Sequence, residues 1–285
     1  MFVVLDKDTI VEEIIPHLPK RKRGFKPKSP ISEIINCILY KLKTGIQWAL
    51  LPMEQLFSEV VPSYKTVFGH YRKWCEEGAW QTCWVEILKK NKSKIDCSSC
   101  DFDGSQTPAK KGGEEVGYQS RKKAKTTNSL FLSDRQGLML AMSQPISGQH
   151  HDLYNIETHF QEITSVLKKA EISTEGLFVN FDAGFDSENL RKITASEGII
   201  ANICENKRNQ KSPSETEHYF DKKLYKERYA IERSNAWMDS FRSVLNRFDT
   251  TVSSWIGFNY LAFIVLGLRK FKQKQKVEMS SLFLV

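Results

Sequence analysis

The segment that decides the fold runs from Leu177 to Cys204 and reads LFVNFDAGFDSENLRKITASEGIIANIC. Its first five residues, 177–181, are almost wholly apolar and predict a buried strand. A helix is expected over 187–196, and the apolar run 199–204 predicts a second strand. Strands that alternate with a helix in this way are typical of an α/β fold.

The elements around this segment complete a mixed α/β order. The strands expected upstream are short β-type runs separated by turns that contain glycine. In chain order, we expect strands at 100–104, 129–132 and 138–144, an amphipathic helix at 152–170, a polar loop at 205–218 and closing helices at 219–248 and 254–272.

The first 92 residues predict a small all-helical domain of the helix-turn-helix kind. Apolar side chains at helical spacing indicate helices that stop at Pro16, Gly45 and Gly78. The segment 20–28 has six basic side chains in nine positions, together with a glycine and a proline, and predicts an extended basic arm. The main helices are expected at 30–43, 64–76 and 79–90, and the second of these turns Lys65, Arg72 and Lys73 outward.

The composition is that of a chain that folds and binds a polyanion. The sequence has 42 Lys and Arg against 34 Asp and Glu, a formal net charge of +8. Such an excess favours a polyanionic partner, although charge alone does not distinguish DNA, RNA and a membrane surface. Residues 1–28 are too charged for a signal peptide, so a cytoplasmic protein is expected. The apolar run 256–268 is shorter than the roughly 20 residues that span a bilayer, which indicates a buried helix.

Two short motifs could hold a metal, and both favour a simpler interpretation. Cys97 and Cys100 form one CxxC, but no second close pair of Cys or His accompanies them, whereas a zinc site needs four ligands. His150, His151 and Asp152 are adjacent in the chain, so their side chains point in different directions. We interpret these residues as a turn before the next helix.

Carboxylates at strand ends point to phosphodiester chemistry. Metal-assisted cleavage needs hard oxygen ligands held close together. Asp103 ends the strand at 100–104, and Asp182 follows the strand at 177–181. If these strands are neighbours, both carboxylates open onto one edge of the sheet. Either residue alone would more simply be a turn or cap aspartate.

A third carboxylate, Glu232, lies inside the helix expected at 219–248. It belongs to a polar stripe at helical spacing, and a solvent-exposed face is the alternative interpretation. An aromatic hydroxyl, a guanidinium and a carboxylate on one face are suited to grip a phosphate and its metal. The polar stripe consists of Tyr225, Arg228, Glu232 and Asp239, and the apolar stripe of Ala230, Trp237, Phe241, Val244 and Phe248.

These motifs together resemble those of a known family. The pattern Tyr225-x-x-Arg228-x-x-x-Glu232 looks like the Y-R-E signature of bacterial insertion-sequence transposases of the DDE class. Residues 103–127 and 181–187 resemble the blocks that carry the family's two aspartates, and residues 17–52 resemble its helical N-terminus. The likeness covers nearly the whole chain, and four motifs in the family's order are far more specific than any one.

The resemblance implies a fold and a chemistry. It implies a ribonuclease-H-like mixed sheet flanked by helices at 93–285, preceded by the DNA-binding domain at 1–92. Two Mg²⁺ or Mn²⁺ ions would be held for cleavage of element ends and strand transfer to target DNA. It implies terminal inverted repeats and target DNA as partners, a homodimer on DNA and a place in the nucleoid. The implied residues are Asp103, Asp182 and Glu232 for catalysis and metal, Tyr225 and Arg228 for a DNA phosphate, and Lys20, Arg21, Lys22, Arg23, Lys65, Arg72 and Lys73 for DNA.

Some positions stay open. Asp101 and Asp186 compete with Asp103 and Asp182, which we prefer because the family places its aspartates directly before Gly-Ser and directly after the apolar strand. The signature expects a lysine where this chain has Asp239, and Arg242 is a candidate to replace it. The alternative functions are a sequence-specific DNA-binding regulator derived from an inactive transposase, and a ribonuclease-H-like nuclease without strand transfer.

Overall fold

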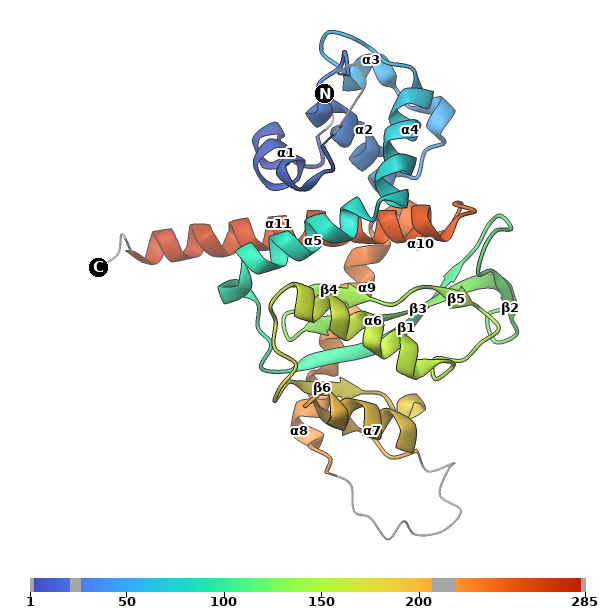
Figure 1. Cartoon of the computed structure of the whole chain (residues 1–285), viewed down its shortest axis with the longest axis vertical. Coiled ribbons are helices and arrows are strands. Elements are labelled where there is room, and N and C mark those ends of the chain that lie inside the picture. The colour runs from blue at the N-terminus through green and yellow to red at the C-terminus, as the bar shows by residue number, and fades with distance from the viewer. Residues whose placement is uncertain (1–2, 21–26, 207–218, 283–285) are drawn as a thin grey trace. The chain divides into compact units, whose positions relative to one another are not determined.

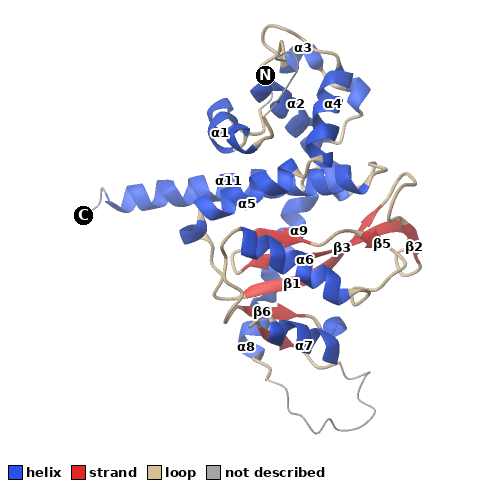
Figure 2. Cartoon of the chain, in the orientation of Figure 1, coloured by secondary structure: helices blue, strands red, loops and turns tan. Residues whose placement is uncertain are grey.

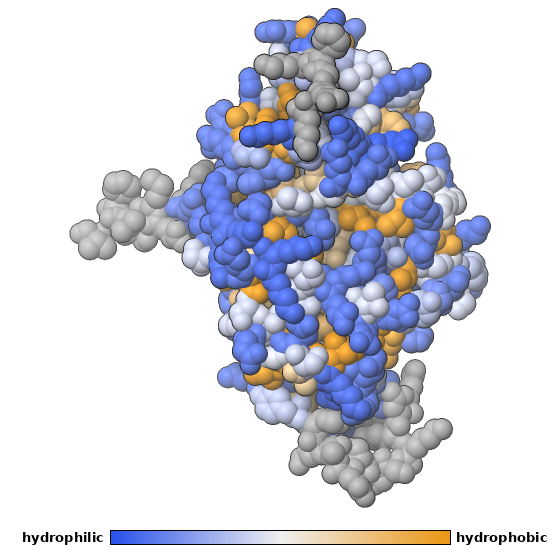
Figure 3. Space-filling view, in the orientation of Figure 1, coloured by the Kyte–Doolittle hydropathy of each residue, from blue (hydrophilic) through white to orange (hydrophobic). Residues whose placement is uncertain are grey.

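The computed structural model describes residues 3–20, 27–206 and 219–282. The chain divides into two compact units, whose elements are labelled in Figure 1 and coloured by type in Figure 2. The helical unit comprises residues 1–90, 107–114 and 237–285, and the sheet unit comprises residues 91–106 and 115–236. The face drawn in Figure 3 is largely hydrophilic, with apolar side chains in small patches.

The sheet unit contains one mixed, seven-stranded sheet. Strands β1, β6 and β7 pair in parallel, whereas β2, β4 and β5 pair antiparallel with β3. The order along the main path is β2-β3-β1-β6-β7. The predicted mixed α/β fold, a mixed sheet flanked by helices, is confirmed by this topology. The strands are β1 (Cys100–Pro108), β2 (Gly117–Gln119), β3 (Ala124–Asp134), β4 (Met139–Met142), β5 (Ile146–Ser147), β6 (Phe178–Phe181) and β7 (Ile200–Ile203).

Two amphipathic helices cover one side of this sheet. Helix α6 (Ile156–Lys169) packs on β3 and β4, and helix α7 (Glu188–Ser196) packs on β7 and on α6. In Figure 1 both helices lie in front of the strands. The aromatic side chains of Phe102, Phe160 and Phe181 meet beneath α6, with ring centroids 5.1 to 6.3 Å apart. This buried cluster fixes β1 against β6, the two strands that carry the candidate aspartates.

A further helical segment of the sheet unit contacts β6 and β7, where Asn180 donates to the Leu224 carbonyl and Asn202 to the Asp221 carbonyl. It consists of α8 (Lys222–Tyr225), the 3₁₀ turn η5 (Lys226–Arg228) and the first part of α9 (Tyr229–Asp239). The Oγ of Ser234 in α9 donates a hydrogen bond of 2.7 Å to the carbonyl of Gly137 between β3 and β4. The short 3₁₀ turn η4 (Ala183–Phe185) follows β6.

The helical unit is built around its long last helix, α11. This helix packs against α4 and α5 and contributes the buried side chains of Trp255, Phe258 and Leu261. Within it, the window Val252–Gln275 is long and apolar enough to cross a membrane, but 72% of that window is buried inside the protein, as in a core helix. The helices are α1 (Lys7–Glu13), α2 (Ile31–Thr44), α3 (Met53–Leu56), α4 (Tyr64–Glu76), α5 (Ala79–Lys90), α10 (Arg242–Leu245) and α11 (Val252–Leu282), with 3₁₀ turns η1 (Ile15–His17) and η2 (Trp48–Leu50); η3 (Lys92–Lys94) follows in the sheet unit.

Two expectations differ from this architecture. The division at residue 92 assigned 93–285 to one catalytic domain, whereas 237–285 packs with the helical unit because α11 needs the apolar faces of α4 and α5. The helix expected over 219–248 is interrupted, since Phe241 adopts extended backbone angles (φ −96°, ψ 109°) before α10. The apolar stripe is therefore not continuous, and Trp237 and Phe248 are 38% and 49% exposed.

Candidate active site

The parallel pairing of β1 and β6 places Asp103 and Asp182 side by side. Phe102 is paired with Phe181 in the strand register, so the next residue on each strand is one of the two aspartates. The Asp103 carboxylate accepts a hydrogen bond of 2.9 Å from the Gly104 N–H. The Asp182 carboxylate caps η4 by accepting from the N–H of Gly184.

Arg228 connects the two carboxylates. Its Nη2 lies 3.1 Å from Asp103 Oδ2 and 3.9 Å from Asp182 Oδ2. The Arg228 side chain is 16% exposed and that of Asp103 is 23% exposed, so this ion pair is mostly withdrawn from water. A guanidinium thus lies between a carboxylate inside β1 and one directly after β6; β1 continues to Pro108, so Asp103 does not end its strand as predicted.

Burial and neighbouring charges shift the pKa values of Asp103 and Tyr225. The pKa of Asp103 is raised to about 6, chiefly by burial; Arg228 and the Gly104 N–H act to lower it, and the charges of Asp182 and Asp152 act to raise it. Burial also raises the pKa of Tyr225, whose hydroxyl is influenced by Arg228, Asp182 and Asp103. Both pKa shifts are expected where buried carboxylates lie close together, and such a group of carboxylates favours the binding of a cation.

Hydrogen bonds fix the helical segment that carries Arg228 to the strands. Asn180 Nδ2 donates to the Leu224 carbonyl at 3.4 Å and to Asp101 Oδ1 at 2.9 Å. Asn202 Nδ2 donates to the Asp221 carbonyl at 3.0 Å, and Asp221 caps α8. Asp101 is 2% exposed and also accepts from the Ile231 N–H. These contacts hold η5, and hence Arg228, beside β1 and β6.

The competing aspartates have other partners. Asp101 is buried among Asn180 and the backbone of α9, and burial raises its pKa to about 6. Asp186 pairs with Arg191 at 2.8 Å and accepts from the Asn206 N–H. Both carboxylates serve contacts within the fold, which leaves Asp103 and Asp182 as the pair that faces Arg228.

Glu232 lies one helical turn beyond Arg228 and is exposed on α9. In the part of the chain that the structure describes, no group of three or more His, Cys, Asp or Glu side chains is close enough to hold a metal ion. The structure therefore brings Asp103 and Asp182 together with Arg228, whereas Glu232 does not join the two aspartates in a cluster.

Asp152 lies beside Asp103, although its place in the sequence indicated only a turn. Its Oδ1 accepts a hydrogen bond of 2.7 Å from Nδ2 of the fully buried Asn128. A Cβ atom built on Gly104 would lie 2.5 Å from the same oxygen, so the Asp152 carboxylate uses the space left by that glycine. The turn expected at 150–152 extends to Asn155, and α6 begins at Ile156 and not at the predicted residue 152. Only the folded chain shows which strand this turn meets.

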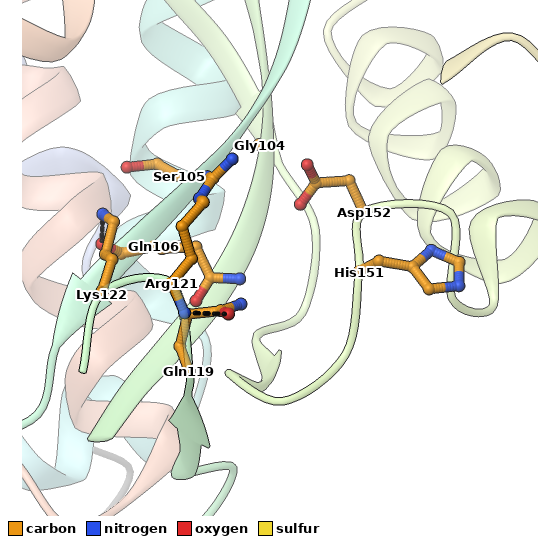
Figure 4. A pocket seen from close by; sticks show the side chains of 8 residues that line it. All are labelled: Gly104, Ser105, Gln106, Gln119, Arg121, Lys122, His151 and Asp152. Carbon is orange, nitrogen blue, oxygen red and sulfur yellow. Dashed lines mark hydrogen bonds between the residues drawn. The ribbon is translucent and has the colours of Figure 1, made fainter. Parts of the chain in front are cut away.

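A hollow of about 340 Å³ opens next to Asp103 (Figure 4). Three walls enclose it: the second half of β1, the hairpin between β2 and β3, and the turn before α6. The lining residues are 104–106 from β1, Gln119, Arg121 and Lys122 from the hairpin, and His151 and Asp152 from the turn.

The predicted DNA-binding side chains lie on the surface of the helical unit where they are described. Lys65, Arg72 and Lys73 are exposed on α4. Arg72 pairs with Glu76 at 3.0 Å and Lys73 with Glu77 at 3.6 Å. Lys20 is exposed, whereas Arg21, Lys22 and Arg23 of the basic arm lie outside the described residues.

The replacements considered for the signature lysine lie in the other unit. Asp239 ends α9, and Arg242 begins α10 beyond the interruption at Phe241. Both are exposed and belong to the helical unit, whereas Glu232 belongs to the sheet unit.

Two family models match the chain. Residues 95–264 match the model described as "DDE superfamily endonuclease", which covers more than half of the sequence. The chain belongs to the DDE endonuclease superfamily. Residues 7–84 match the model described as "Putative transposase of IS4/5 family". The resemblance to insertion-sequence transposases of the DDE class is confirmed by these matches.

One relative and two solved structures are similar to this chain. The "insertion element IS402 uncharacterized 16.2 kDa protein" of Burkholderia cepacia is 31% identical over 114 residues, which are 38% of this chain and 74% of that protein. The fold is similar to the piggyBac transposase in a synaptic complex with hairpin DNA, with a TM-score of 0.56 and 9% identity over 95% of this chain and 75% of the other. The Mos1 transposase in a paired-end complex gives a TM-score of 0.29 with 14% identity, covering 86% of this chain and 79% of the other. The protein is thus a transposase-family endonuclease with the fold of that class.

Proposed function

We propose that this protein cuts DNA at the ends of an insertion sequence and joins the freed 3′-hydroxyls to target DNA. The observation that carries the proposal is the pair of carboxylates on adjacent parallel strands, Asp103 and Asp182, with Arg228 between them. Carboxylates held close together supply the oxygen donors of metal-dependent phosphoryl-transfer centres. The family assignment narrows the substrate to DNA.

The donor set fits Mg²⁺ or Mn²⁺. Oxygen ligands with a surplus of negative charge suit hard cations, and the burial and mutual repulsion that raise the pKa of Asp103 are relieved by a cation. We propose that Asp103, Asp182 and Glu232 hold two divalent ions, with Glu232 approaching from its exposed position on α9. Such ions stabilise the charge on the attacking and leaving oxygens of an in-line displacement.

Arg228 and Tyr225 are proposed to hold a DNA phosphate near the cut. Arg228 forms an ion pair with Asp103. Tyr225 is close enough to Asp103 and Asp182 for their charges to raise its pKa. A guanidinium can donate two parallel hydrogen bonds to a phosphate, and a tyrosine hydroxyl can donate one. When DNA is bound, Arg228 would move part of its hydrogen bonding from Asp103 to the phosphate.

The helical unit is proposed to bind the terminal inverted repeats. Lys20 to Arg23 would contact phosphates, while Lys65, Arg72 and Lys73 of α4 would lie on DNA as in helix-turn-helix proteins. Joining two ends requires two active sites, so we propose a homodimer on DNA within the nucleoid. Residues 1–92 would supply DNA recognition, and the sheet unit would supply the chemistry.

The test is incubation of the protein with duplexes of its own flanking ends and Mg²⁺ or Mn²⁺. The products are separated on a denaturing gel. We expect a cut that leaves a 3′-hydroxyl at the element end, followed by a joined product when target DNA is added. Tight binding of the ends without cutting under either metal would instead support a DNA-binding regulator, and cutting without joining would support a plain nuclease.

A further inference from the structure

The hairpin between β2 and β3 presents a concentrated positive charge. Strands β2 and β3 pair antiparallel, with Tyr118 opposite Lys125 and Gln119 opposite Ala124. The segment 119–125, here called the basic hairpin, contains four cationic side chains in its last five positions, and all four are exposed. They are Arg121, Lys122, Lys123 and Lys125.

Hydrogen bonds attach the basic hairpin to the strand that carries Asp103. Lys122 Nζ donates to the Gln106 carbonyl at 2.6 Å. Thr126 Oγ1 donates to Gln106 Oε1, also at 2.6 Å. Gln106 is three residues beyond Asp103 on β1, and the hairpin forms one wall of the hollow (Figure 4).

Intramolecular partners do not neutralise most of this charge. Among the residues that the structure describes, no ion pair joins Arg121, Lys123 or Lys125 to a carboxylate. The cations of α4 differ, because Arg72 and Lys73 each pair with a glutamate one turn away. Unneutralised guanidinium and ammonium groups beside a hollow favour binding of an anion.

The hollow has opposite charges on its walls. Arg121 and Lys122 face it from the hairpin, and Asp152 faces it from the turn before α6. Gly104 contributes no side chain between them, and a Cβ there would collide with Asp152. A DNA strand in this hollow would place its phosphates against the basic hairpin. The opposite wall contains Asp152, whose charge also acts on Asp103.

We infer that the hollow and the basic hairpin bind the sugar-phosphate backbone of the DNA strand that is cut, next to the scissile phosphate. This inference rests on the proposed function, because it assumes that DNA is cut at Asp103 and Asp182. The contacts are to phosphates and not to base edges, so they position the strand in the site without reading its sequence.

The experiment compares two double variants of the full-length protein. Arg121→Gln with Lys123→Gln removes two cations of the hairpin, and Lys169→Gln with Lys192→Gln removes two exposed cations from α6 and α7 of the same unit. Binding to an end duplex is measured in EDTA over a range of salt concentrations. The slope of log affinity against log salt should fall by about 0.9 for each phosphate that the variant no longer neutralises. The control variant should keep the wild-type slope.

Cleavage separates this inference from the proposed function. If wild-type protein cuts end DNA, the hairpin variant should show a raised KM with kcat little changed, because the strand is held less well while the carboxylates are intact. An unchanged salt slope and KM in that variant would overturn the inference alone. A defect restricted to joining pre-cut ends would indicate that the hollow binds target DNA, and this result would also overturn the inference. Failure of the wild type to cut would refute the proposed function, whereas the binding measurement would still test the hairpin.

Discussion

Arg228 should stabilise the metal-free sheet unit in a pH-dependent way. The perturbation is Arg228→Gln, which removes the guanidinium 3.1 Å from Asp103 but keeps a polar side chain. The two side chains are 16% and 23% exposed, and breaking such a mostly buried pair costs about 3–5 kcal/mol. Asp182 is farther from Arg228, at 3.9 Å, and its side chain is 45% exposed, so its ion pair with Arg228 should contribute little to the free energy of unfolding.

The sign of the pH dependence follows from the pKa of Asp103. Its folded pKa of about 6 is above its ordinary value of 3.8, so ionised Asp103 destabilises the fold at pH 8, and this cost falls progressively as the pH drops from about 6 to about 4. The difference corresponds to about 3 kcal/mol at about 1.4 kcal/mol for each pH unit. Without Arg228 the pKa rises further. Arg228→Gln should therefore cost about 3 kcal/mol at pH 8 and about 1 kcal/mol or less at pH 5, where Asp103 is protonated.

The assay must report on the sheet unit. All six tryptophans lie in the helical unit, so their fluorescence does not report on it. Hydrogen exchange of the backbone amides of β1 and β6 is measured by mass spectrometry at increasing urea concentrations in EDTA. It gives the free energy of opening of these strands. Arg135→Gln is the control, since its pair with Glu227 has side chains 46% and 30% exposed and should contribute about 1 kcal/mol or less at either pH. An equal loss for Arg228→Gln at pH 5 and pH 8 would refute the reasoning.

Two other predictions concern the helical unit. Replacing Lys20, Arg21, Lys22 and Arg23 with Ala should reduce the slope of log affinity for end DNA against log salt by up to about 0.9 for each phosphate that the arm neutralises, and an unchanged slope would remove the arm from the interface. Gly257→Ala should destabilise this unit by about 1–3 kcal/mol, because the added Cβ would lie 2.4 Å from Cys75 Sγ and 3.2 Å from Trp80 Cδ1. Gly69→Ala in α4 is its matched control: nothing lies within 4 Å of the added atom, so it should stabilise by about 0.5–1 kcal/mol. Tryptophan fluorescence in urea measures both, and equal effects would contradict the packing argument.

Local patterns in the sequence were sufficient for most of the elements. The helices at 64–76 and 79–90 begin and end where capping and glycine signals placed them, with Ser63 accepting from the Lys65 N–H. Strand β6 and helix α7 also follow the predicted bounds within one residue. Helix α2 has Pro30 at its cap position, and the Oγ of the preceding Ser29 donates a hydrogen bond to the distant Val60 carbonyl. Short-range signals do not reveal such a distant partner.

Long-range contacts explain what the sequence did not predict. The apolar stripe through Trp237 and Phe248 suggested one continuous helix, but Phe241 adopts an extended conformation that interrupts it, and the following α10 packs on α2. Asp152 was interpreted as a turn residue because nothing near it in the chain indicates that Gly104 leaves room for its carboxylate. Asp103 and Asp182 could be brought together in advance because their strands were expected to be neighbours with both carboxylates at one edge of the sheet. The strands are parallel neighbours, but β1 continues to Pro108, so only Asp182 lies at a strand end.

The most direct test of the central claim is cleavage by three single variants, Asp103→Ala, Asp182→Ala and Glu232→Ala. Each is incubated with end DNA and Mg²⁺ or Mn²⁺, and binding of the same DNA is measured in parallel. We expect every variant to lose cutting while keeping nearly wild-type affinity for the ends, because metal ligation is removed and the DNA-binding surfaces are intact. A variant that cuts at the wild-type rate would contradict the role given to that residue, and wild-type cutting by all three would refute the proposed active site.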